Sequence, residues 1–377
     1  MVQFLGSTSI DPRYTFAWVG KGVALADLAR YEEAIECLDK ALMIDPQNDI
    51  AWSNKGNTLG ELRRYEEAIG CCDKALAIDP RNMRAWSNKA DVLRNLGRYE
   101  EAIICFDKAY AIDSRFVNVW KGKATALCQL GRHKEAVSYY DKALAINPQD
   151  ANIWSLKGIA LHVLGQRKEE IDCYNKAIEV DPQYASAWSL KGALLDELGQ
   201  REEAIGYYNK ALAIDPRNAI VWFNKAKVLL PLGRFEEGLG ALDKSLAIDP
   251  RNKIAWIFKG AVLSDLGRVE EALGCCDKAL AIDPRDEQAW FCKGSWLGPL
   301  GRHEDAIKHY ENALAINQRN AQAWLNKALS EDVVKRRREA VNSYRKFLEF
   351  GSSQDAKKIA FVRQRIQELE RALTVGN

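Results

Sequence analysis

Residues 49–82 read DIAWSNKGNTLGELRRYEEAIGCCDKALAIDPRN, and this stretch decides the fold. Its first half places Trp52 and Leu59 on one apolar face at helical spacing, which predicts an amphipathic helix. A second apolar face begins at Tyr65 and predicts another helix. Pro80 ends that helix because proline cannot continue it. The stretch therefore predicts two antiparallel helices joined by a short turn.

The same stretch recurs along the chain every 34 residues, and a tryptophan marks each copy. These tryptophans stand at positions 18, 52, 86, 120, 154, 188, 222, 256, 290 and 324, with nothing inserted or deleted between them. The predicted repeats are 15–48, 49–82, 83–116, 117–150, 151–184, 185–218, 219–252, 253–286, 287–320 and 321–354. One helix pair cannot bury its apolar face alone, so stacked pairs predict a one-dimensional solenoid.

The repeat resembles that of the tetratricopeptide repeat (TPR) family. Matching residues in one copy are Trp188, Gly192, Ala204, Tyr208, Ala211 and Pro216. The resemblance implies an all-α, right-handed superhelical α-solenoid of ten helix-turn-helix repeats. Two positions depart from the family's pattern, because Lys stands at repeat position 7 and Leu at position 11.

The two ends of the chain differ from the repeats. Residues 1–14 include Ser9–Tyr14, which copy the closing segment of a repeat and predict a remnant of a preceding one. The first helix would then have an uncovered face, in a chain cut from a longer array or beginning in the middle of a repeat. Residues 355–377 predict a capping helix and a tail, with Ile359, Val362 and Ile366 on the apolar stripe. A coiled-coil seam is the alternative, although the stripe is short for one.

Composition argues against several function classes. The net charge is +2, which gives no drive toward nucleic acid or an acidic membrane. We find no signal peptide and no apolar run of membrane-spanning length. Nine cysteines without a disulfide framework favour a cytoplasmic protein, and those at repeat positions 23 and 24 are predicted to be buried fillers. No catalytic motif, cofactor motif or metal-ligand spacing is present, so we expect a protein that is not an enzyme.

Lysine occupies repeat position 7 in all ten repeats, from Lys21 and Lys55 to Lys327. One interpretation is a basic ladder for an anionic polymer. The other is that each ammonium pairs with one of the regularly placed aspartates, and the balanced net charge favours it.

Three residues should disturb the regular array. Glu170 replaces the small residue at position 20, so its carboxylate must swing out or find a partner, and the fifth repeat is predicted to be the loosest joint. Pro231 and Pro299 should end or kink their first helices early.

A binding face is predicted from the positions that vary between repeats, namely 2, 5, 6, 9 and 12 of the first helix. In the TPR family this face lines a concave groove for peptides or partner segments, and the resemblance implies the same here. Its polar part includes Ser53 and the candidate residues Asn54, Asn57, Arg84, Asn88, Asp91 and Arg94. Its apolar part includes Leu325 and the candidates Phe223, Asn224, Ile257, Phe258, Phe291 and Asn326, and the candidate Trp296 lies beside it. Contiguous apolar side chains are typical of a binding surface, unless the array packs them against itself.

The family's clamp for acidic chaperone tails is incomplete in this sequence. Starting from the second repeat, Asn57 and Asn88 match, whereas Ser53, Asn118 and Gly122 stand where the clamp has cationic residues. We therefore do not expect an acidic chaperone tail as the ligand.

The sequence favours a peptide- or protein-binding scaffold or adaptor with no cofactor. One alternative is a structural protein that self-assembles through the uncovered N-terminal face. The other is a regulatory or targeting arm of a larger enzyme. Neither the partner's identity nor its conformation follows from the sequence.

Overall fold

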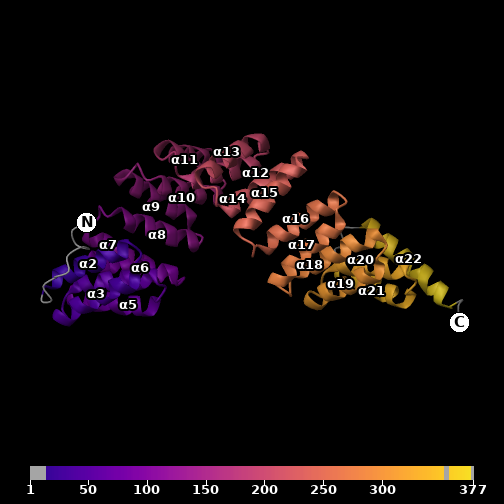
Figure 1. Ribbon diagram of the computed structural model, residues 1–377, viewed down its shortest axis with the longest axis horizontal. Coiled ribbons are helices and arrows are strands. Elements are labelled where there is room, and N and C mark those ends of the chain that lie inside the picture. The colour runs from indigo at the N-terminus through magenta and orange to yellow at the C-terminus, as the bar shows by residue number, and fades with distance from the viewer. Residues whose placement is uncertain (1–13, 352–355, 375–377) are drawn as a thin grey trace. The chain divides into compact units, whose positions relative to one another are not determined.

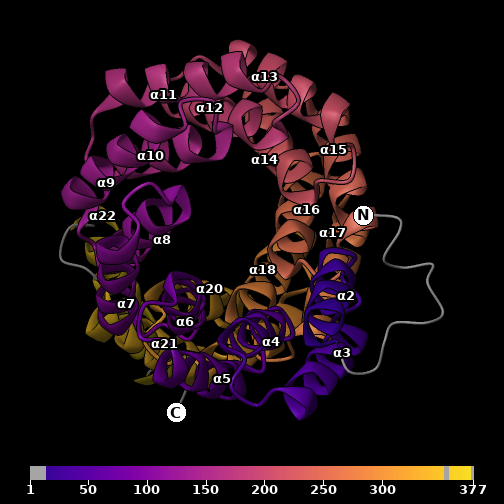
Figure 2. The same cartoon turned by 90° about the vertical axis from the view of Figure 1, so that its left-hand side faces the viewer.

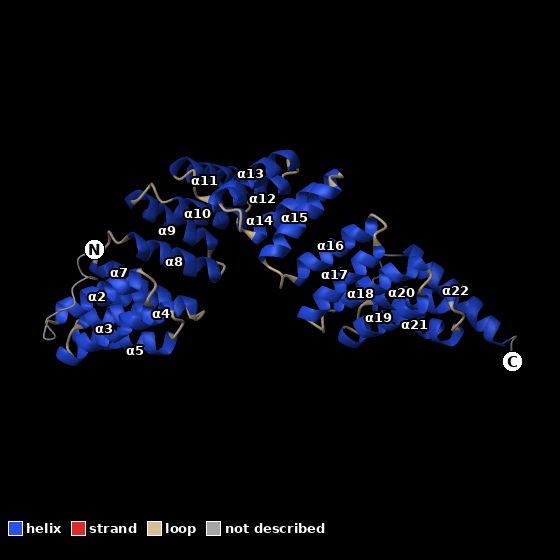
Figure 3. Cartoon of the chain, viewed as in Figure 1, coloured by secondary structure: helices blue, strands red, loops and turns tan. Residues whose placement is uncertain are grey.

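The computed structural model describes residues 14–351 and 356–374, and within them it contains helices and no strand (Figure 3). The helices are α2 (Thr15–Asp27), α3 (Tyr31–Ile44), α4 (Asp49–Glu61), α5 (Tyr65–Ile78), α6 (Met83–Asn95), α7 (Tyr99–Ile112), α8 (Val117–Gln129), α9 (His133–Ile146), α10 (Ala151–Val163), α11 (Arg167–Val180), α12 (Ala185–Glu197), α13 (Arg201–Ile214), α14 (Ala219–Leu229), η1 (Leu230–Leu232), α15 (Phe235–Ile248), α16 (Lys253–Asp265), α17 (Val269–Ile282), α18 (Glu287–Leu297), η2 (Gly298–Leu300), α19 (His303–Ile316), α20 (Ala321–Val333), α21 (Arg337–Phe350) and α22 (Ala356–Thr374).

The chain forms an α-solenoid that divides into two compact units, unit 1 (Met1–Lys191) and unit 2 (Gly192–Asn377) (Figure 1). In unit 1, α4 contacts α5 and α6, and α6 contacts α7 and α8. In unit 2, α16 contacts α17 and α18 in the same way. Within each unit the first helices of the pairs therefore line one face and the second helices the other (Figure 2).

Neighbouring repeats share their apolar cores. Leu59, Ala68 and Cys71 of one repeat form a cluster with Val92 of the next. The cysteines predicted as fillers are buried, and burial raises the pKa of the Cys72 thiol to about 12. Cores of this kind explain why a single pair would not hold its fold alone.

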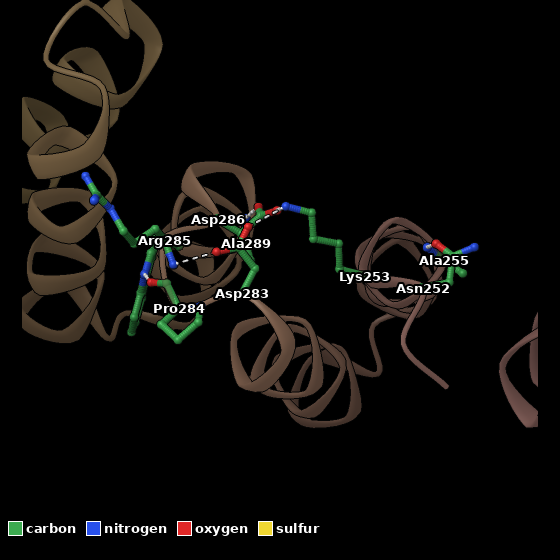
Figure 4. Close-up of polar contacts among 9 residues, drawn as sticks. Asn252, Lys253, Ala255, Asp283, Pro284, Arg285, Asp286 and Ala289 are labelled. Atoms are coloured by element: carbon green, nitrogen blue, oxygen red, sulfur yellow. Dashed lines mark hydrogen bonds and ion pairs between the residues drawn. The ribbon is translucent and has the colours of Figure 1, made fainter. Parts of the chain in front are cut away.

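The connection between repeats is built from short polar contacts, which Figure 4 shows for the turn before α18. Asp286 caps that helix by accepting a hydrogen bond from the Ala289 amide at 2.9 Å. Lys253 donates to Asp283 at 2.6 Å and lies 2.8 Å from the Asp286 carboxylate. The Asp283 carboxylate also accepts from the Arg285 amide at 3.0 Å. Asn48, Asn82, Asp150, Asn218, Asn252 and Asn320 cap other first helices in the same way.

Seven of the ten lysines at repeat position 7 pair with acidic residues of the preceding repeat, and Lys191 donates to the Asn175 side chain at 2.6 Å. Lys55 lies 2.5 Å from Asp39, and Lys327 lies 3.1 Å from Glu311. The other pairs are Lys89–Asp73, Lys123–Asp107, Lys157–Asp141, Lys259–Asp243 and Lys293–Asp277. These contacts confirm the pairing interpretation of the lysine column.

The residues that break the repeat pattern behave as expected. α14 and α18 each end after 11 residues, and a 3-10 turn carrying Pro231 or Pro299 follows. The Glu170 side chain is buried, and its carboxylate finds partners in His162 at 2.9 Å and Arg167 at 3.0 Å. Whether this joint is the loosest one stays a prediction.

The C-terminal helix α22 covers the last helix pair. Val362, Ile366 and Leu369 are buried in one cluster with Tyr344 and Phe347 of α21. These contacts are those of a capping helix. The predicted start of the cap at residue 355 and the repeat remnant at Ser9–Arg13 lie outside the described residues.

Candidate functional site

A polar groove of about 650 Å³ lies in unit 1, across the first helices α4, α6 and α8. It is lined by Asn54, Asn57, Glu61, Arg84, Ser87, Asn88, Asp91, Arg94, Asn95, Phe116, Asn118, Lys121, Gly122, Thr125 and Leu156. All six candidates from the polar part of the predicted face are among them. The structure thus brings together residues that the sequence related only through their repeat positions.

Helical periodicity explains why these side chains share one face. Asn54, Asn57 and Glu61 follow one another at spacings of three and four along α4, so they project in one direction. Asn88 and Asp91 do the same on α6. Since α4 contacts α6 and α6 contacts α8, the rows from the three helices form one continuous surface.

The asparagine amides of the groove are partly used by the protein itself. Asn54 donates to the Ile50 carbonyl at 2.9 Å, and Asn88 donates to the Ser53 carbonyl at 3.0 Å. Each of these contacts uses one amide hydrogen, whereas an amide offers two donors and an acceptor. Donor and acceptor capacity for a ligand backbone therefore remains on both side chains.

The charges of the groove are mixed. Arg94 donates to Asp91 at 3.0 Å. Desolvation between the groove walls raises the pKa of Asp91, and the Arg94 guanidinium opposes that shift. The Arg94 Nε is buried and has no acceptor among the described residues. A buried donor without a partner costs free energy, so a small shift that brought an acceptor to this atom would stabilise the groove.

Two charged residues of the groove, Glu61 and Lys121, were not among the predicted site residues. Lys121 stands at position 5, which belonged to the predicted face, so its position and its charge could have marked it as a candidate. Glu61 stands at position 13, outside the predicted positions, and only the stacking of α4 on α6 places it in the groove.

Position 5 is less open than predicted. Ser53 is 1% exposed and Leu325 is 5% exposed, so the prediction that both side chains face the groove is wrong. The physical reason is that adjacent first helices touch along this row, as the hydrogen bond from Asn88 to the Ser53 carbonyl shows.

The apolar candidates in unit 2 are partly covered by one another. Phe223 and Phe258 make an edge-to-face contact with ring centroids 5.7 Å apart. Phe291 packs 6.0 Å from Tyr310, and Ile257 packs against a cluster that contains Ala279, Leu280 and Ala289.

Trp296 fills the space above a glycine. A Cβ added to Gly260 would lie 2.7 Å from the Trp296 ring, so the indole occupies the room that a larger residue would take. The Asn224 side chain is half-buried, and Asn326 accepts from Gln322 at 2.8 Å. The apolar side chains that stay open on these first helices are Ile220, 68% exposed, and Ile254, 63% exposed.

The described part of the chain offers neither a metal site nor a membrane-spanning helix. We find no group of three or more potential metal ligands among those residues. No helix in the same residues is long and apolar enough to cross a membrane.

Comparison with family models gives tetratricopeptide repeat matches along most of the array. Residues 16–48, 50–82, 117–150 and 185–218 match one such model, residues 71–104 and 207–239 a second, and residues 254–286 a third. Residues 167–198 match the protein prenyltransferase alpha subunit repeat. No curated protein sequence matches the chain.

Solved structures of low sequence identity are similar to parts of this chain. A tetratricopeptide repeat protein from Parabacteroides merdae is 17% identical, covers 66% of this chain and 98% of its own, and has a TM-score of 0.53. PilF of Pseudomonas aeruginosa is 23% identical over 54% of this chain and 92% of its own, with a TM-score of 0.48. YrrB, described as a TPR protein with an unusual peptide-binding site, is 24% identical over 49% of this chain and 95% of its own, with a TM-score of 0.38.

Proposed function

The chain belongs to the tetratricopeptide repeat family, a family of protein-interaction scaffolds, and from this premise we propose that it binds a peptide segment of a partner protein in the groove of unit 1. The observation that carries the proposal is the groove itself, in which all six polar candidates line one cavity. Its volume of about 650 Å³ is within the range of ligand sites, roughly 300–1,000 Å³.

The side chains of the groove suit a peptide better than a small apolar ligand. Asn54, Asn57, Asn88, Asn95 and Asn118 all line it. Amides can donate to carbonyls and accept from N–H groups, which are the groups that a peptide backbone presents. The Arg94 guanidinium, whose side chain is 28% exposed, adds further N–H donors for a ligand carbonyl. Chemistry is not required of any of these residues, so the proposed role is presentation of a surface.

The apolar first helices of unit 2 are proposed as a second contact surface. Ile220 and Ile254 leave much of their side chains open beside the Phe223–Phe258 pair. Large exposed apolar side chains in neighbouring repeats are a feature of interaction sites. The contact here would be made by apolar side chains of the partner rather than by its backbone.

Affinity capture from the source cell lysate, followed by mass spectrometry, tests the two surfaces separately. An Asn57→Ala, Asn88→Ala variant removes amides from the unit 1 groove. The matched control is Asn209→Ala, Asn312→Ala, which changes two exposed asparagines of second helices. We expect a partner that the parent and the control retain and the groove variant loses, with all three equally helical by circular dichroism.

A Phe223→Ser, Phe258→Ser, Phe291→Ser variant provides the test for unit 2. If it still retains the partner, the apolar side chains of unit 2 only stabilise the fold. If every variant retains the same proteins, or only further copies of this chain, the groove is not the binding site and self-assembly becomes the better account.

A further inference from the structure

The side chains of the groove favour one backbone conformation of the ligand, an inference that rests on the peptide-binding function proposed above. An α-helix satisfies its own N–H and C=O groups except at its ends, so an amide-lined groove gives it little. An extended segment leaves those groups open along its length. The asparagines of α4, α6 and α8 therefore favour an extended ligand that crosses the three helices in turn.

The groove also presents charged side chains to such a ligand. Glu61 lies on α4 and Lys121 on α8, at opposite sides of the groove, and neither forms an ion pair with another described residue. Between them on α6, Asp91 and Arg94 pair with each other. That central pair contributes no net charge, which leaves an acidic side at α4 and a basic side at α8.

Three observations indicate that Glu61 and Lys121 are the charges that act within the central part of the groove. Both Glu61 and Lys121 lie close enough to Asp91 to act on its carboxylate, Glu61 raising its pKa and Lys121 lowering it. Partial burial raises the pKa of the same carboxylate, whose side chain is 45% exposed, so charges there are screened somewhat less than at a fully open surface. The remaining charged residue of the groove, Arg84, is exposed at the first turn of α6, seven residues before Asp91.

We infer that the groove selects an extended peptide carrying a basic residue where it crosses α4 and an acidic residue where it crosses α8. Glu61 would pair with the basic residue and Lys121 with the acidic one. Packed helices lie roughly 8–10 Å apart, so two steps span about 16–20 Å. An extended chain rises about 3.3 Å per residue, so this span corresponds to about five or six residues. An even separation also keeps both side chains on one side of the strand.

Selection from a displayed library of random twelve-residue peptides tests this inference on the full chain. Three proteins serve as baits: the parent, a Glu61→Lys, Lys121→Glu variant, and the Asn57→Ala, Asn88→Ala variant. A fourth bait, Glu66→Lys, Lys108→Glu, makes the same charge exchange on exposed residues of second helices. We expect the parent and this control to enrich peptides with opposite charges about six residues apart, and these peptides to bind the Glu61–Lys121 variant about tenfold more weakly.

The outcomes distinguish the inference from the function on which it rests. If peptides need Asn57 and Asn88 but show no charge pattern, or if the Glu61–Lys121 exchange leaves their binding unchanged, the charge inference is overturned and peptide binding stands. If no selected peptide depends on Asn57 and Asn88, the groove does not bind peptides and the proposed function fails.

Discussion

At the scale of single residues, the turn between the two helices of a repeat needs one residue with positive φ. Glycine fills this place in several repeats, for example Gly97 with φ 78°, but Arg63 adopts φ 59° at the equivalent position. A residue with a Cβ pays a steric cost in this region that glycine avoids.

We predict that Arg63→Gly stabilises the protein by up to about 1 kcal/mol, because it removes that cost. Gly97→Arg is the reciprocal change and should destabilise by a similar amount. Urea unfolding followed by circular dichroism measures both. A loss of stability in Arg63→Gly would show that the arginine side chain contributes more than its backbone conformation costs.

A second residue-scale prediction concerns Arg167, the partner of the buried Glu170. Removing one member of a buried ion pair leaves an uncompensated charge, which typically costs about 3–5 kcal/mol. Arg167 is itself 40% exposed and His162 still lies 2.9 Å from the Glu170 carboxylate, so we expect Arg167→Ala to cost less, about 2 kcal/mol, in urea unfolding. Arg132→Ala removes an exposed arginine from a pair at the same spacing, 2.7 Å from Glu135, and should cost below about 1 kcal/mol.

The double variant Arg167→Ala, Glu170→Ala separates pairing from packing. It restores the small residue found at this position in neighbouring repeats, such as Ala136 and Ala204. It should recover most of the stability lost in Arg167→Ala. If it does not, the side chains contribute mainly through their packing and the ion pair is incidental.

At the scale of helices, the capping helix α22 is held by charge as well as by its apolar stripe. Arg365 donates two hydrogen bonds to the Asp332 carboxylate of α20, at 2.6 and 2.9 Å. This paired geometry is stronger than a single contact, and it raises the pKa of Arg365 above its ordinary value.

We predict that Arg365→Ala loosens α22 selectively. Amide hydrogen exchange in α22 should quicken several-fold, whereas exchange in α16 and α17 stays unchanged. Arg363→Ala, on the same helix with an exposed side chain, serves as the control and should leave exchange as it is in the parent. Equal effects of the two substitutions would mean that the apolar cluster alone holds the cap.

Sequence alone predicted the helices well, because their signals are local and repeated. The apolar period and the prolines each act within a few residues, and the early ends of α14 and α18 follow from Pro231 and Pro299. The burial of Ser53 and Leu325 was missed, since it depends on how closely one first helix approaches the next.

The candidate site was predictable in its polar part and less so elsewhere. Asn57 and Asp91 stand at repeat positions that vary, and the groove contains both. Glu61 enters the groove only through stacking of α4 on α6, which no local pattern reports. Trp296 was placed on the binding face, whereas its ring fills the space over Gly260. That contact joins α16 to α18, so it depends on how the two helices stack in the packed array.

At the scale of the whole molecule, the array should respond to damage locally. Each repeat in a solenoid contacts its neighbours, so its stability is a sum of internal and nearest-neighbour terms. Tyr140 is 1% exposed in a cluster with Trp120, Leu144 and Ile153, which belong to α8, α9 and α10. Tyr344 has the same repeat position near the other end and packs with α20 and α22.

We predict that Tyr140→Ala, which should cost about 3–4 kcal/mol as a large cavity-forming change, lowers exchange protection most in α8–α10, with an effect that fades over the adjoining repeats. Protection in α18–α21 should stay at its parental level. Tyr344→Ala is the corresponding substitution near the other end, and its loss of exchange protection should be confined to α20–α22 and their neighbours. Hydrogen exchange with mass spectrometry at peptide resolution gives both profiles in one measurement. If either substitution lowers protection evenly along the chain, the repeats unfold as one cooperative body, and the nearest-neighbour description is wrong for this protein.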